Sequence, residues 1–190
     1  MGLFCRLVIR FTTMEQVTKF ESHNPKLKKE VADYLEYVFN HIDSIFLSKQ
    51  VLNRFMWTVT ENSDSHENIK YLGQPYWSKK AIIHYQYLNT GRKLKDFTDL
   101  RHDHSVPKID IVNEILDIVK CNSKISSDEI FNIFDSKAHA VVITKQEDLE
   151  LKKIGLNRKL PEDKNPITRY NMANIEIVNV TGFDLKTIKL

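Results

Sequence analysis

Residues 138–147 read Ala-His-Ala-Val-Val-Ile-Thr-Lys-Gln-Glu, and this stretch predicts a strand that passes directly into a helix. The run from Ala140 to Ile143 is apolar and β-branched, which is typical of a buried strand. Thr144 and Glu147 then form a capping box, in which the two side chains bond the free amides at a helix start. We expect the helix to stop at Gly155, because glycine readily adopts the left-handed conformation that ends helices.

A second strand is predicted further along the chain, from Ile175 to Val180, after a short helix that begins at Pro166. The two strands are both apolar and are separated by a helical crossover. We therefore expect them to lie in one small sheet in the C-terminal third of the chain.

The rest of the sequence is dominated by helical patterns. Asn24-Pro25 is typical of a helix start, and apolar residues then recur every three or four positions, which indicates an amphipathic helix. The residues of this stripe are Leu27, Val31, Leu35, Val38, Ile42 and Ile45. Further helices are predicted at 49–59, 76–88, from Pro107 onward, and after a second capping box at 126–129. An early apolar segment, Leu3 to Phe11, favours a short strand.

Together these patterns predict an α+β fold: a mainly helical single domain of residues 1–190 with a small sheet in its C-terminal third. Residues 25–90 form the helical part, and residues 100–180 form a mixed part that carries the candidate site. The chain has 42% hydrophobic and 28% charged residues, an ordinary globular composition. Its length allows a substantial core without disulfides or metal ions.

Charge and cysteine content narrow the functional classes. The net charge is +3, from 28 basic and 25 acidic residues, which argues against a protein that coats nucleic acid non-specifically. No run approaches 18 apolar residues, so we expect no membrane span. Cys5 and Cys121 lie far apart, without zinc-type spacing, and favour a cytoplasmic location. The sequence has only five glycines, and they form no glycine-rich loop of the kind that binds phosphate groups.

The densest group of reactive side chains is Leu100-Arg-His-Asp-His-Ser-Val-Pro107. In an extended segment alternate residues share a face, so His102 and His104 would point one way and Arg101 and Asp103 the other. Histidine and carboxylate together supply a general base and a metal ligand. The same residues also suit a helix entry, in which Ser105 or Asp103 caps the helix and the imidazoles bond loop carbonyls.

The element Asp103-His104-Ser-Val-Pro107 resembles the Asp-His-x-x-Pro element that opens many HNH-type (ββα-metal) nuclease motifs. The strand-to-helix step from Ala140 to Ile154 is similar to the element that closes such motifs. The chain departs from the family pattern because it inserts about two helices between these halves. It also lacks the usual Asn or His on the closing helix.

The resemblance implies a metal-dependent endonuclease. A divalent ion, Mg²⁺ or Mn²⁺, would be held by Asp103 and by Glu147 or Asp148, and His104 would take a proton from the attacking water. His102 is the second catalytic candidate. Basic side chains that could grip nucleic acid phosphates are Arg92, Lys93, Lys95, Arg101, Arg158 and Lys159.

The capping box gives Glu147 a competing role, because a carboxylate that bonds its own helix is poorly placed to hold a cation. The alternative function is therefore a non-enzymatic helical interaction protein that binds a protein partner. Either function suits a phage, plasmid or defence-system protein. Convergence of Asp103, His104 and a carboxylate of the 145–150 helix would favour the nuclease, and their separation would favour the interaction protein.

Overall fold

The computed structural model describes residues 14, 16–21, 23–41, 45–60, 71–89 and 98–190. Within these residues the chain forms seven helices and four strands, which confirms the predicted α+β class with its mainly helical content and small sheet. The strand predicted from Leu3 to Phe11 lies outside the described residues.

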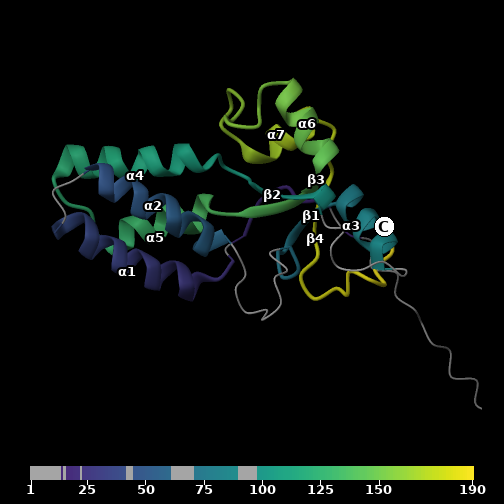
Figure 1. Cartoon of the computed structure of the whole chain (residues 1–190), viewed down its shortest axis with the longest axis horizontal. Helices are drawn as coiled ribbons and strands as arrows, with labels where there is room; N and C mark the ends of the chain where they lie inside the picture. The colour runs from purple at the N-terminus through teal and green to yellow at the C-terminus, as the bar shows by residue number, and fades with distance from the viewer. Residues whose placement is uncertain (1–13, 15, 22, 42–44, 61–70, 90–97) are drawn as a thin grey trace, which may run out of the picture.

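Four helices form one side of the molecule (Figure 1): α1 (Pro25–His41), α2 (Ile45–Thr60), α4 (Lys108–Asn122) and α5 (Ser127–Lys137). Their apolar faces meet in a shared core, which includes Leu35 of α1 and Ile115 of α4. Val31, Leu35 and Val38 of the predicted stripe are buried on α1. The helix is shorter than predicted, because Ile42 lies outside the described residues and Ile45 begins α2. The sequence thus places its strongest helical periodicity where four helices bury one another.

The other side holds a four-stranded sheet of order β2-β3-β1-β4. Its strands are β1 (Tyr76–Ser78), β2 (Leu100–His104), β3 (Ala140–Thr144) and β4 (Ile177–Asn179). Strand β1 pairs parallel with β3, and the outer strands pair antiparallel. The two strands predicted from the sequence do share one sheet, but β1 lies between them.

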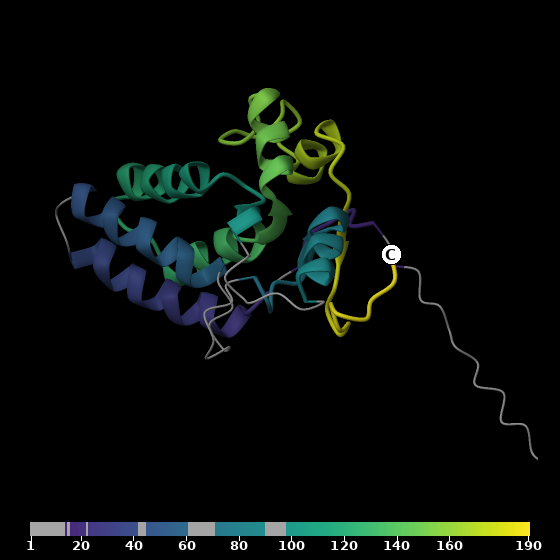
Figure 2. The same ribbon diagram turned by 45° about the vertical axis from the view of Figure 1, so that its right-hand side comes forward.

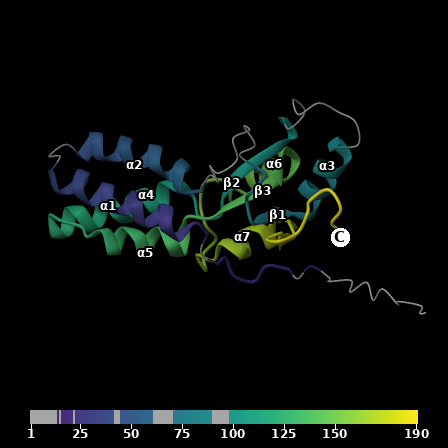
Figure 3. The same cartoon turned by 90° about the horizontal axis from the view of Figure 1, so that it is seen from below.

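Helices cover both faces of this sheet (Figures 2 and 3). On one face Trp77, Val142 and Val178 pack against α3 (Lys79–Asn89). On the other, the alternate residues pack against α6 (Lys145–Lys153) and α7 (Pro166–Met172). Strands β1, β3 and β4 therefore place apolar residues on both faces, as expected of a sheet between helical layers, whereas β2 carries the polar run Arg101–His104.

One boundary differs from the prediction. Residues 76–88 were expected to form one helix, but Tyr76–Ser78 form β1 and the helix starts at Lys79. The change from strand to helix occurs at Ser78. Its hydroxyl accepts a hydrogen bond from the Ala81 amide at 3.0 Å and so caps α3. Both predicted capping boxes, at Ser126 and at Thr144, are present.

None of the helices in the described part of the chain is long and apolar enough to cross a membrane.

The bundle core makes a direct test of this fold. Leu35 is fully buried among the four helices, whereas Tyr37 is exposed on the same helix. Leu35→Ala should lower the free energy of unfolding by about 2–5 kcal/mol, because it leaves a cavity in a packed core. Tyr37→Ala should change it by only about 0.5 kcal/mol. Urea denaturation of both variants measures this, and equal effects would contradict the packing.

Candidate functional site

The candidate residues lie on β2, an edge strand that joins the helical bundle to the sheet (Figure 1). The predicted alternation is correct. His102 and His104 face Trp57 of α2, with ring centroids 5.5 and 5.1 Å from the indole. Asp103 points to the opposite face, toward α7. The strand thus divides the candidate residues between two environments.

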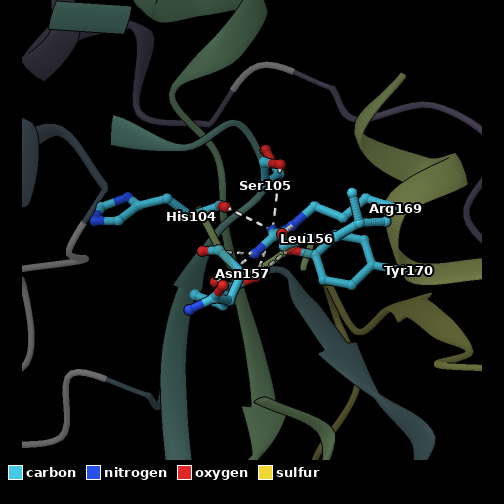
Figure 4. Close-up of polar contacts among 7 residues, drawn as sticks. His104, Ser105, Leu156, Asn157, Arg169 and Tyr170 are labelled. Carbon is cyan, nitrogen blue, oxygen red and sulfur yellow. Dashed lines mark hydrogen bonds and ion pairs between the residues drawn. The ribbon is translucent and has the colours of Figure 1, made fainter. Parts of the chain in front are cut away.

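Asp103 forms a buried, bidentate ion pair with Arg169 of α7, whose side chain lies among His104, Ser105, Leu156 and Asn157 in Figure 4. Nη1 lies 2.7 Å from Oδ2, and Nη2 lies 3.1 Å from Oδ1. The Arg169 side chain is fully buried. Its guanidinium also donates to four backbone carbonyls, those of His104, Ser105, Leu156 and Asn157. A buried charge is tolerated only when paired and hydrogen-bonded, and this network meets both conditions.

Tyr170 completes the network. Its phenol donates to Asp103 Oδ2 at 2.7 Å, and burial together with the Asp103 charge raises the pKa of Tyr170 well above its usual value. The phenol therefore stays protonated and remains a donor. Asp103 accepts three charge-assisted or phenolic hydrogen bonds, so both carboxylate oxygens are engaged.

His104 lies in an apolar and cationic environment. Neither of its ring nitrogens has a hydrogen-bond partner. Burial, together with the nearby His102, Lys108 and Arg169, lowers the pKa of His104 to about 3. The imidazole is therefore neutral at pH 7. Its pKa lies well below the range near neutrality that suits a general base. His102 instead contacts the Thr60 carbonyl through Nε2 at 3.2 Å.

Glu147 is committed to the starts of two helices. Its Oε2 accepts from the Thr144 amide at 2.8 Å and from the Ser78 hydroxyl at 2.6 Å. Because Ser78 caps α3 and Thr144 caps α6, this one carboxylate ties the two helices together. The side chain is almost fully buried. In the structure Glu147 therefore has the capping role that was expected to compete with metal binding.

The structure does not bring Asp103 and Glu147 together. Asp103 pairs with Val141 across the strands, whereas Glu147 follows Thr144, which pairs with Leu100. Three residues of strand separate these positions, or about 10 Å. Asp148 is half-buried one position further along α6. Within the described residues no group of three or more His, Cys, Asp or Glu side chains is arranged to hold a metal ion.

The described residues include three of the six predicted phosphate-binding side chains. Arg101 folds back onto its own backbone and donates to the Thr98 and Leu100 carbonyls. Arg158 and Lys159 are exposed on the loop between α6 and α7. Arg92, Lys93 and Lys95 lie outside the described residues.

The sequence reasoning missed the partners of these residues. No local pattern in the sequence links Arg169 to Asp103, which is 66 residues away. Ser78 was placed inside a helix. The sequence did contain one usable sign of an exposed apolar side chain. Ile82 and Ile83 are adjacent on α3, and a helix that buries one face cannot bury both of them fully.

Comparisons of the chain with protein-family models, with curated proteins and with solved structures gave no match.

The ion pair yields a stability prediction. Asp103→Asn should lower the free energy of unfolding by about 3–5 kcal/mol, because Arg169 would keep its buried charge without a counter-charge. The matched control is Arg158→Ala, an exposed arginine whose loss should cost about 0.5 kcal/mol or less. Thermal and urea unfolding measure both. A stable Asp103→Asn variant would mean that the pair does not hold β2 to α7.

His104 yields a pH prediction. The pKa of His104 is about 3 in the folded protein, against the ordinary histidine value of 6.5 in the unfolded chain. Between these two pH values the unfolded chain binds a proton at His104 that the folded protein does not bind. The free energy of unfolding should therefore fall as the pH drops below about 6.5, at up to about 1.4 kcal/mol per pH unit. His104→Leu should flatten this slope in urea titrations near pH 7 and pH 5. An unchanged slope would contradict the burial of a neutral ring.

Proposed function

We propose that this chain is a non-enzymatic interaction protein, and that a groove between α3 and α6 binds an amphipathic, acidic helix of a protein partner. The observation that carries the proposal is an apolar strip left exposed along this groove. Ile83 and Tyr87 of α3 are 56% and 63% exposed, and Leu149 of α6 is 40% exposed. Single exposed apolar residues are ordinary, but a contiguous group typically marks an interaction surface.

The groove has one face of α3 on one side and α6 on the other, a layout that suits a partner helix. Lys80, Ile83, His84 and Tyr87 stand at positions i, i+3, i+4 and i+7 of α3, so they form one face. Lys145, Gln146 and Leu149 form the opposite wall from α6, and Thr144 and Asp99 also line the depression. Its volume is about 740 Å³. Grooves that bind amphipathic helices present this kind of apolar floor between two ridges.

Charge indicates the chemistry of the partner. Lys80 and Lys145 are both exposed at the walls of the groove, and Asp99 is the one acidic residue among the described residues that line it. Acidic residues beside the apolar anchors of a partner helix would meet these ammonium groups and fix its orientation. The Glu147 carboxylate holds the starts of α3 and α6 together, so the two walls are rigidly placed before a partner arrives.

The residues once assigned to catalysis support this choice. Asp103 is paired with Arg169, and Glu147 accepts hydrogen bonds at the starts of two helices. The ring of His104 is neutral and makes no hydrogen bond to the described residues. Their separation is the outcome that favours an interaction protein over a nuclease.

A defined peptide pair tests the proposal. The probe is a helical peptide of about 18 residues, long enough for five turns, with leucines on one face and glutamates beside them. A matched peptide carries lysines in place of the glutamates. The acidic peptide should bind more tightly, as measured by fluorescence anisotropy. An Ile83→Ser, Tyr87→Ser variant should weaken its binding about tenfold or more, because two apolar anchors are lost.

Tyr37→Ser is the control, because Tyr37 is exposed on α1 and outside the groove. Equal binding of both peptides, or binding that survives the Ile83 and Tyr87 substitutions, would contradict the proposal. The nuclease hypothesis is examined in parallel with plasmid DNA and RNA in Mg²⁺ or Mn²⁺ against EDTA. Metal-dependent cleavage that His104→Ala abolishes in a folded protein would replace the proposed function.

A further inference from the structure

A second group of polar side chains lies buried where the bundle meets the sheet, apart from both β2 and the α3–α6 groove. Lys28 comes from the first turns of α1, and His23 from the segment just before it. His139 directly precedes β3, and Asp135 lies near the end of α5. The positive charge of Lys28 lowers the pKa of both His23 and His139, which places all three in one electrostatic neighbourhood.

These nitrogens are not satisfied within the protein. Lys28 is fully buried, and its Nζ lies 4.0 Å from the Asp135 carboxylate, beyond hydrogen-bond distance, with no hydrogen-bond partner among the described residues. His139 is 3% exposed; the Ser136 backbone lies close enough to raise its pKa, but neither ring nitrogen makes a well-formed hydrogen bond to the described residues. His23 Nε2 is likewise buried without a partner. A buried donor left unpaired is costly, so such a group commonly marks a missing ligand.

Burial lowers the pKa of Lys28 to about 8 and the pKa of His139 to about 4. At neutral pH Lys28 is therefore still mostly cationic, while His139 is neutral and offers one N–H and one lone pair. An ammonium and imidazole N–H groups are anion donors. A metal ion fits poorly, because the fixed ammonium repels it and no metal-ligating trio occurs in the described chain.

A cavity of about 570 Å³ lies directly beside this group. Asp135 lines it and also faces Lys28. Phe20 lines it and stacks on His139, with ring centroids 5.5 Å apart. Pro166 and Ile167 add apolar wall. Lys28 and His139 do not line the cavity themselves, but each contacts a residue that does, Asp135 and Phe20 respectively. Glu21 and Lys19 add one acidic and one basic side chain to its lining.

We propose that this cavity binds a small phosphomonoester. Its phosphoryl group takes the Lys28 ammonium from Asp135 and accepts an N–H from His139, and its organic part lies against Phe20 and Ile167. The flexible four-carbon arm of Lys28 allows the ammonium to turn toward the cavity. This site is independent of the α3–α6 groove, so either proposal can fail without the other.

Calorimetric titration with phenyl phosphate, inorganic phosphate and acetate tests the site on the full chain. Phenyl phosphate should bind more tightly than inorganic phosphate, because only its ring reaches the apolar wall, and acetate should bind weakest. Lys28→Met should weaken phenyl phosphate binding about tenfold or more. Lys19→Met is the matched control, because Lys19 also lines the cavity but is exposed, and its binding should change by less than about threefold.

Asp135→Asn separates a ligand site from a structural ion pair. It should strengthen phenyl phosphate binding, because Lys28 no longer shares its charge with a carboxylate. This variant keeps the proposal open to refutation even if Lys28→Met fails to fold. No detectable binding by the wild type, binding unchanged in Lys28→Met, weaker binding in Asp135→Asn, or acetate binding as tightly as phenyl phosphate would each overturn it.

Discussion

A buried guanidinium has to find acceptors for five N–H bonds, and Arg169 does so by gathering the end of β2 and the loop after α6 around α7. Asp103 supplies the counter-charge and four backbone carbonyls supply the rest. This requirement fixes the register of β2, the entry into α4 and the position of α7 at once.

The same requirement explains why the most reactive-looking stretch of the chain is structural. Because Asp103 must face α7, the pleat of β2 turns His102 and His104 toward Trp57 and the bundle. The strand therefore joins the two halves of the molecule, with an ion pair on one face and stacked rings on the other. The surfaces that we propose for recognition lie elsewhere: the α3–α6 groove and the cavity beside Lys28.

Local patterns predicted the parts of this fold that depend on local contacts. The capping boxes at Ser126 and Thr144, the α1 stripe and the alternation along β2 all involve neighbours within a few residues, and all are present. The sequence could not identify the partner of Asp103, because Arg169 is distant in the chain and its choice depends on the packing of α7. Residues 76–78 were misassigned because Tyr76 and Trp77 suit a buried helix as well as a buried strand. The same side chains become a strand only because β3 and β4 lie on either side.

The order of the sheet has a consequence for biosynthesis. Strand β1 leaves the ribosome early, yet both of its neighbours come late, β3 at Ala140–Thr144 and β4 at Ile177–Asn179. Until they emerge, the nascent polypeptide holds the apolar Tyr76–Ser78 segment without any backbone pairing, and such bare segments are prone to aggregate. The sheet is therefore completed only after residues 177–179 have emerged, well after β1 itself has been made.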